Sequence, residues 1–403
     1  MSRRRGSAAA AVTAAFVGPG TVTTCSLAGA EHGLTLLWAL TLSLAVLLIA
    51  QTQSVRLGAA GRVSLAQGLM QEIRSPLLRA LAALLVVGAI GVGCAAYQAG
   101  NLLGTAEGVR ALAAVDGTTA FVASSIAAVL LLAFARRERL LQALTWLVFV
   151  MGIAFLVAAS IARPSLSELF HGALVPRLPG GESGRGAFLL VAGLVGTTVV
   201  PYNLFLHSAL VRDRTEGAAD LPRERRDGLV FLPIGVAMSM WIVIAAAGAY
   251  HGLPDRPTRL HEFAGQLAGP LGRFGQAAFA VGVLSAGLTS ALTAPMAAGL
   301  ALSELAPRAP RALRLAASWG VMAAGVAAGA LGGSPTRIIQ GAQVLNGLLL
   351  PISLGFLVYV ARSRRLLGDA RSGPLALAGG LLALAVSIAL AVATALKLWP
   401  AST

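Results

Sequence analysis

Long apolar runs, separated by short clusters of charged and turn-forming residues, fill most of this chain. A helix needs about 20 apolar residues to cross the hydrocarbon core of a bilayer, and each run is long enough for one crossing. We therefore expect an all-α polytopic membrane protein whose termini lie on opposite sides of the membrane. The runs predict eleven spans, at residues 8–30, 34–55, 77–98, 118–135, 140–162, 187–211, 229–251, 274–304, 315–332, 337–361 and 374–398.

Two of the predicted spans are interrupted by a proline. The first contains Gly18-Pro19-Gly20-Thr21, and the sixth contains Val200-Pro201-Tyr202-Asn203. Proline lacks a backbone N–H and frees carbonyls that lipid cannot satisfy, so such a break is tolerated where it lines a cavity. The pair of breaks predicts a transport site near the bilayer midplane. The alternative is that the two prolines only kink their helices.

Composition leaves no room for a separate soluble domain. Hydrophobic residues make up 57% of the 403 residues and charged residues 12%, and the mean hydropathy is +0.79. Residues 1–403 are expected to form one transmembrane domain. We expect residues 1–162 to form a first repeat, residues 187–361 an inverted second repeat, and residues 374–398 an additional span. Each broken span is then the first span of its repeat.

The basic residues predict an orientation. Most of the 31 Lys and Arg residues fall in alternate connecting segments, as at Arg56, Arg62 and Arg212. The positive-inside rule then places the N-terminus in the cytoplasm and the C-terminus outside a cell (plasma) membrane. Because these arginines are not gathered on one face, the net charge of +15 does not indicate nucleic-acid binding. Met1–Arg5 resembles the start of a signal peptide, but we expect the following span to be retained.

Several segments resemble one family of membrane proteins. The resemblance runs from about Gly18 to Arg365 and is to the Nramp family of divalent metal transporters. It implies a secondary transporter with an inverted-repeat, leucine-transporter-like fold in which helices 1 and 6 are broken. It also implies a monomer that carries a divalent ion such as Mn, Mg or Fe. The matching segments are 18–30, 36–40, 54–58, 101–105, 199–211, 298–304 and 343–351.

The resemblance fails at the residues that hold the metal. Metal-transporting members have Asp-Pro-Gly-Asn at the first break, whereas this chain has Gly18 and Thr21 in place of the carboxylate and the amide. At the second break they have Met-Pro-His-Asn, whereas this chain has Val200 and Tyr202 in place of the methionine and the histidine. A soft sulfur ligand and a charged ligand are therefore both missing.

A polar path in the third span is also changed. Proton-coupled members carry an aspartate and a glutamate there, and the matching residues are Gln98 and Asn101. The resemblance implies that Thr197 matches a position whose backbone carbonyl contributes to the site. Asn203, His207 and Gln343 are the same residues as in the family. The expected substrate-binding set is Gly18, Thr21, Thr197, Val200, Asn203 and Gln343, and the expected polar pathway is Tyr202, His207, Gln98 and Asn101.

The cargo stays open at this point. One hypothesis is a divalent ion that stays hydrated, bound through Asn203 and the backbone near Thr197, with little proton coupling. Another is a transporter of the same fold for a monovalent cation or a small polar or anionic solute, and a third is a membrane sensor that does not transport. Each polar residue also has a structural interpretation, such as a helix cap or an interhelical hydrogen bond. No nucleophile, base and orienting group converge, so neither an enzyme nor a cofactor is expected.

Overall fold

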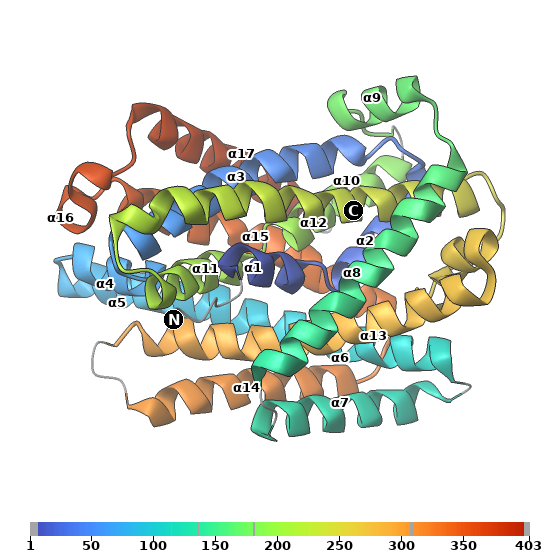
Figure 1. Ribbon diagram of the computed structural model, residues 1–403, viewed down its shortest axis with the longest axis horizontal. Coiled ribbons are helices and arrows are strands. Elements are labelled where there is room, and N and C mark those ends of the chain that lie inside the picture. The colour runs from blue at the N-terminus through green and yellow to red at the C-terminus, as the bar shows by residue number, and fades with distance from the viewer. Residues whose placement is uncertain (1–6, 114, 135–136, 180–181, 307–309, 399–403) are drawn as a thin grey trace, which may run out of the picture.

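The computed structural model describes residues 7–113, 115–134, 137–179, 182–306 and 310–398, and these residues form helices and no strands (Figure 1). Among these described residues, ten helices are long and apolar enough to cross a membrane, and the bent pair near the start makes an eleventh if it is counted as one span. The prediction of about eleven spans is confirmed. Their bounds are α1 (Ala8–Phe16) with α2 (Pro19–His32), α3 (Leu37–Ala59), α5 (Pro76–Val86) with α6 (Gly93–Leu112), α7 (Gly117–Phe134), α8 (Arg137–Ala162), α10 (Glu182–Thr198) with α11 (Pro201–Arg214), α12 (Leu221–Tyr250), α13 (Gly265–Ser303), α14 (Arg311–Ala330), α15 (Pro335–Ala361) and α17 (Pro374–Leu398).

Three predicted boundaries were wrong by more than two helical turns. The third span continues to Leu112 rather than ending at residue 98, because its polar residues face other helices and so do not end the helix. The seventh begins at Leu221 rather than at residue 229, and the eighth begins at Gly265 rather than at residue 274. The predicted end of the fourth span, residue 135, and the segment Met1–Arg5 lie outside the described residues.

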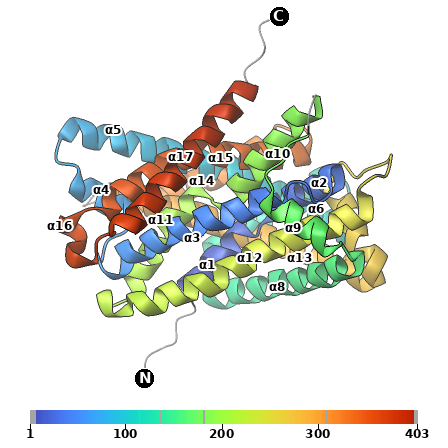
Figure 2. The same cartoon turned by 90° about the horizontal axis from the view of Figure 1, so that it is seen from above.

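The helices run between two ends of the molecule, which carry different loops (Figures 1 and 2). We call one the Arg-rich end: Ala8 of α1, Ala59 of α3 and Val211 of α11 pack together there. The opposite end carries the last turn of α2 and the first turn of α15, which line one cavity. Leu398 lines a second cavity together with Arg337, so the described chain begins at one end and finishes at the other.

Short helices cap both ends. At the Arg-rich end lie α4 (Leu65–Glu72) and α16 (Arg364–Leu367), and at the opposite end lies α9 (Leu166–Leu174). Reciprocal capping boxes begin two of them, Ser64 with Gln67 in α4 and Ser165 with Glu168 in α9. Hydrogen bonds from Ser165 lower the pKa of Glu168 below its usual range, so its carboxylate stays charged as a cap.

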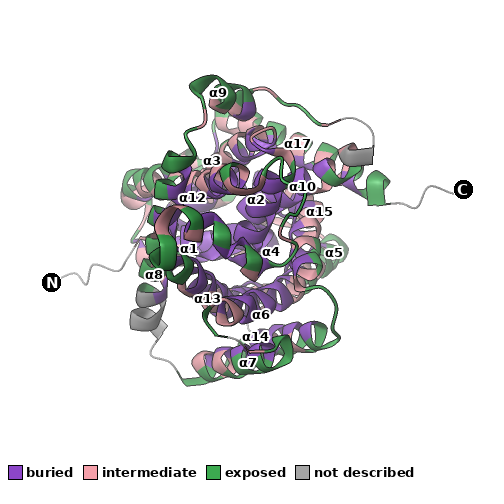
Figure 3. Ribbon diagram, turned by 90° about the vertical axis from the view of Figure 1, so that its right-hand side faces the viewer, coloured by how far each residue is buried: buried purple, intermediate pink, exposed green. Residues whose placement is uncertain are grey.

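Burial separates an inner group of helices from an outer one. The inner helices α2 and α11 are almost wholly buried, and α10 is buried from Leu190 to its end. Figure 3 shows the exposed residues on the outward faces of peripheral helices. Those faces are apolar rather than charged, as expected where lipid replaces water. Examples are Leu77, Leu81 and Leu84 of α5, Ile126 and Leu130 of α7, Trp146 and Ile153 of α8, and Leu382, Ile388 and Val392 of α17.

Candidate functional site

The first break divides one span into two helices at an angle of 55°. The first helix, α1, ends at Phe16, and Pro19 occupies the first helical position of α2, where its missing N–H costs nothing. Gly18 between them is extended, with φ −115° and ψ −174°, and no side chain caps α2. The break therefore leaves the carbonyl end of one helix and the amide end of another inside the protein.

The second break lies between α10 and α11. Thr198 ends α10, Pro201 begins α11, and Val200 is an extended cap residue whose side chain makes no hydrogen bond. The backbone N–H of Asn203 donates to the carbonyl of Val200 at 3.0 Å. Local chemistry is the same at both breaks, because each second half begins with proline and lacks a capping side chain.

The two breaks meet at a pair of threonines. Thr21 Oγ1 lies 2.8 Å from Thr197 Oγ1, and Thr21 also donates to the carbonyl of Phe16 at 2.5 Å. Both threonines are fully buried. The structure thus brings together two residues of the expected substrate-binding set that are 176 positions apart in the chain.

Gln343 of α15 lies against both breaks. A Cβ on Gly20 would be 2.0 Å from Gln343 Nε2, and a Cβ on Gly196 would be 2.0 Å from the backbone oxygen of Gln343. At Gly196 the contact is with backbone, so only glycine permits this approach of α15 to α10, whereas at Gly20 it is with the flexible end of the Gln343 side chain. Gln343 is buried, and no described residue forms a hydrogen bond with its Oε1.

Asn203 is the least satisfied side chain at the breaks. It is 1% exposed, and neither its Oδ1 nor its Nδ2 has a hydrogen-bond partner among the residues that the structure describes. The hydroxyls of Thr23 and Thr24 on α2 are also buried without partners. A buried amide without partners costs about 1–3 kcal/mol, so its retention needs an explanation. A ligand at the breaks provides one.

Two residues that sequence reasoning missed lie over Gly18. A Cβ at Gly18 would be 2.9 Å from Ser290 Oγ and 3.2 Å from the Tyr97 hydroxyl, so an aspartate there would displace both. The hydroxyls of Tyr97 and Tyr202 each donate to the carbonyl of Ala15 at 3.4 Å. Tyr97 could have been found from its position one turn before Asn101, because residues four apart share a helix face. No signal in the sequence indicates Ser290.

The expected polar pathway divides into separate contacts. Gln98 Nε2 donates to the carbonyl of Ala291 at 3.1 Å and to Met322 Sδ at 3.2 Å, which joins α6 to α13 and α14. His207 Nδ1 lies 2.8 Å from Gln51 Oε1 of α3, and His207 Nε2 has no partner. Asn101 is buried, and its Nδ2 has no partner. Among the described residues, no group of three His, Cys, Asp or Glu side chains could hold a metal ion.

The chain matches a known family over most of its length. Residues 9–397 match the model of the Nramp family, described as natural resistance-associated macrophage protein-like. The chain belongs to the Nramp family. The divalent metal cation transporter MntH of Verminephrobacter eiseniae is 29% identical over 383 residues, which cover 91% of this chain and 84% of that protein. MntH of Bacillus subtilis is 31% identical over 288 residues, or 68% of this chain and 65% of that protein.

Solved structures show the same fold. The manganese transporter of Eremococcus coleocola, in a variant form, superposes with a TM-score of 0.73 at 19% identity, over 96% of this chain and 85% of that one. Mhp1, a nucleobase-cation-symport-1 family transporter, gives 0.55 at 15% identity over 98% and 92%. This Nramp chain therefore has the predicted leucine-transporter-like, inverted-repeat fold with helices 1 and 6 broken.

This Nramp protein has a large cavity at the end opposite the Arg-rich end. We call it the vestibule; it has a volume of about 1680 Å³ and reaches inward to Leu27 of α2 and Leu103 of α6. Hydrogen bonds from Thr119 hold the pKa of Asp116 at its rim below the usual range. The charged residues that line it are Glu31, Glu107, Asp116, Arg110, Arg256, Arg259 and Arg337.

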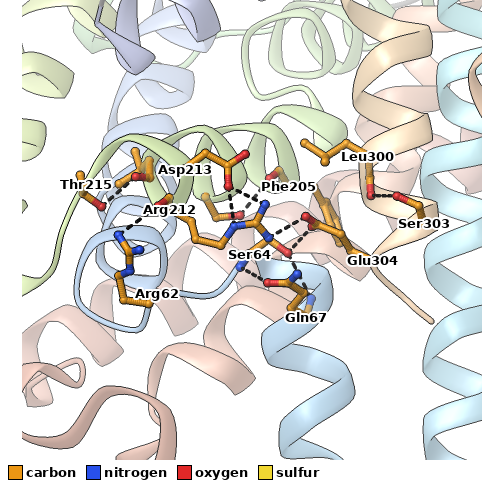
Figure 4. A network of polar contacts seen from close by, with 12 residues as sticks. Arg62, Ser64, Gln67, Phe205, Arg212, Asp213, Thr215, Leu300, Ser303 and Glu304 are labelled. Carbon is orange, nitrogen blue, oxygen red and sulfur yellow. Dashed lines mark hydrogen bonds and ion pairs between the residues drawn. The ribbon is translucent and has the colours of Figure 1, made fainter. Parts of the chain in front are cut away.

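A polar network joins three helices of the Nramp fold at the Arg-rich end (Figure 4). Arg212 at the end of α11 pairs with Glu304, which follows α13, at 2.6 Å, and it also pairs with Asp213. Ser64 donates to the other carboxylate oxygen of Glu304, and the backbone N–H of Leu65 donates to Ser208 Oγ. We call Ser64, Arg212, Asp213 and Glu304 the closing network, because it ties α4, α11 and α13 together below the breaks.

Loss of Glu304 should open the Arg-rich end. The Arg212–Glu304 pair is largely buried, so Glu304→Ala leaves the guanidinium with only the more exposed Asp213 as its partner, at a cost of up to about 3 kcal/mol. We expect Leu65→Cys, at a fully buried position, to react about tenfold faster with a thiol reagent in the Glu304→Ala variant. Labelling is measured after the native Cys25 and Cys94 are replaced by Ala.

Glu72→Ala is the matched control for this measurement. Glu72 lies at the same end and accepts a hydrogen bond from Ser363 at 2.7 Å, but it does not join α11 to α13. Its removal should leave the reactivity of Leu65→Cys unchanged. If Leu65→Cys reacts equally fast in the Glu304→Ala and Glu72→Ala proteins, the closing network does not hold this end closed.

Proposed function

We propose that this protein is a secondary-active transporter in the cell membrane that carries a hydrated divalent cation with little coupling to protons. Family membership and the MntH relatives support the divalent ion. The observation that carries the proposal is the Asn203 amide, which is buried without a partner three residues into α11, where the two breaks meet. An amide in this place has a polar ligand to bind.

Hydration of the ion follows from the charge of the site. Thr21, Thr197, Asn203 and Gln343 are all neutral, and a bare divalent ion needs compensating charge. A cation that keeps its water shell is bound through those waters instead. Their O–H groups donate hydrogen bonds to hydroxyl and amide oxygens of the protein. Magnesium loses its water reluctantly and manganese more readily, so both suit such a site while hydrated.

Weak proton coupling follows from the missing acids. The resemblance predicts a relay at Gln98 and Asn101, and an amide does not titrate near neutral pH. Gln98 is moreover held between α13 and α14 by two hydrogen bonds. His207 and Gln51, which contact each other, form a separate polar pair.

Orientation and conformation form part of the proposal. With the N-terminus in the cytoplasm, the vestibule faces outward and the closing network shuts the cytoplasmic end. We expect a thiol reagent that cannot cross membranes to label Thr118→Cys in intact cells, and Gln71→Cys only after permeabilisation. Both residues are exposed, at opposite ends. The reverse pattern would invert the topology. A monomer is proposed from the fold.

A second candidate is a small polar or anionic solute. Four arginines and three carboxylates line the vestibule, so it does not concentrate cations. A neutral site does not exclude such a solute.

The experiment uses the purified protein in liposomes. Uptake of Mn²⁺, Mg²⁺ and Ca²⁺ is followed with internal indicators while a pH-sensitive dye reports protons. We expect divalent uptake that does not require an imposed pH gradient and moves few protons. Absence of divalent uptake and of calorimetric binding would exclude the cation and favour the second candidate, which uptake of carboxylate or amino-acid solutes then tests.

A further inference from the structure

Hydroxyl groups from three helices cover the carbonyl end of α1. The last carbonyls of a helix have no partner within that helix, so at a break they are natural oxygen ligands for a cation. Here the carbonyl of Ala15 accepts from Tyr97 on α6 and from Tyr202 on α11, each at 3.4 Å. The carbonyl of Phe16 accepts from Thr21 Oγ1 at 2.5 Å and from the N–H of Gly18 at 2.9 Å. The chain itself occupies both oxygens.

Tyr97 holds the central place among these groups. Its hydroxyl lies 3.4 Å from the Ala15 carbonyl and 3.2 Å from the point that a Cβ on Gly18 would occupy. Its ring packs edge-on against Tyr202, with 5.7 Å between the ring centroids, and both rings are buried. The hydroxyl therefore fills the space between the end of α1 and the start of α2.

An occupied carbonyl changes what a cation can find at this site. A cation that sheds water must replace each lost water with an oxygen atom that is free to coordinate it. Hydroxyl protons on the Ala15 and Phe16 carbonyls compete for the same lone pairs and place positive charge beside them. A hydrated cation does not need these oxygens.

We propose that Tyr97, together with Tyr202, determines the specificity of this site by occupying the Ala15 carbonyl, so that a divalent cation is held only with its water shell. This inference rests on the proposed function and names the residues that set its selectivity. Hydrated Mg²⁺ and Mn²⁺ carry the same charge and present the same water oxygens and protons. The native protein should therefore bind the two ions with similar affinity.

Removal of the two hydroxyls tests the proposal. Purified Tyr97→Phe/Tyr202→Phe protein keeps both rings and frees the Ala15 carbonyl. Manganese loses water more readily than magnesium, so calorimetry should show the ratio of Mn²⁺ to Mg²⁺ affinity rising about tenfold, the factor expected when one buried carbonyl changes partner. Uptake into liposomes should shift in the same direction, and each single variant should shift it less.

Tyr250→Phe is the matched control. The Tyr250 hydroxyl also donates to a backbone carbonyl, that of Glu262, at 3.4 Å, but it lies at the opposite end of the molecule. Its loss should leave the ratio unchanged. If the double variant still binds cations and its ratio of Mn²⁺ to Mg²⁺ affinity equals that of the native protein, the proposed role of Tyr97 is overturned.

Failure of the proposed function gives a different pattern. Binding of Mn²⁺ by the double variant but of no divalent ion by the native protein would support the tyrosines as the excluding groups and reject divalent transport. Absence of binding in both proteins would overturn both proposals.

Discussion

Asn203→Ala should abolish most transport while the protein becomes no less stable. Neither polar atom of the Asn203 side chain has a partner in the described part of the chain, so alanine removes no hydrogen bond seen there and relieves a buried, unsatisfied amide. If a hydrated cation binds this amide, its loss should lower uptake into liposomes about tenfold or more. Thermal unfolding of the purified variant should begin at the same or a higher temperature. Loss of function without loss of stability is expected of a residue retained for its ligand.

Gln53→Ala provides the contrasting control. Gln53 is also a buried amide within a span, but its Nε2 donates to the carbonyl of Ala376 at 3.2 Å, which joins α3 to α17. We expect this variant to unfold at a lower temperature and to retain transport. If Asn203→Ala instead transports normally, Asn203 is a structural residue and the observation that carries the proposed function is lost.

Gly196→Ala should disrupt both the packing and the transport of the protein. The new Cβ would lie 2.0 Å from the backbone oxygen of Gln343 and 2.8 Å from the backbone nitrogen of Gly347. Backbone atoms cannot rotate aside as a flexible side chain can, so α10 and α15 must separate. Overpacking of this kind costs about 1–3 kcal/mol or more. The same displacement moves Gln343 and the adjacent Thr197 away from the breaks, and uptake should fall with the unfolding temperature.

Gly186→Ala is the control on the same helix. Apart from its own chain neighbours and the adjacent backbone of α10, no atom of the described residues lies within 4 Å of the point where its Cβ would stand. Alanine favours a helix over glycine by about 0.5–1 kcal/mol, so this variant should be as stable as the native protein or slightly more so. A Gly196→Ala protein with native unfolding temperature and uptake would show that α10 and α15 do not pack as closely as described.

The spans and their breaks could be predicted because each depends on neighbouring residues. Lipid requires every backbone group to be paired within its own helix, which produces long apolar runs, and proline interrupts such a run wherever it occurs. The apolar run ended the predicted third span at residue 98, close to the polar residues Gln98 and Asn101. Both are buried against other helices in the middle of a longer span, and a pattern along one helix cannot reveal what packs against it.

By itself, the sequence determined a membrane protein of about eleven spans, two proline breaks, and the absence of charged side chains from the break residues, all of which are properties of local composition. Only the tertiary structure decided which groups meet at those breaks. It placed Thr21 beside Thr197, set Gln343 against Gly20 and Gly196, and brought the Tyr97 hydroxyl to the Ala15 carbonyl. These pairs come from distant segments, and their contact depends on how closely whole helices approach. That approach is set by packing across the entire bundle rather than by any short stretch of residues.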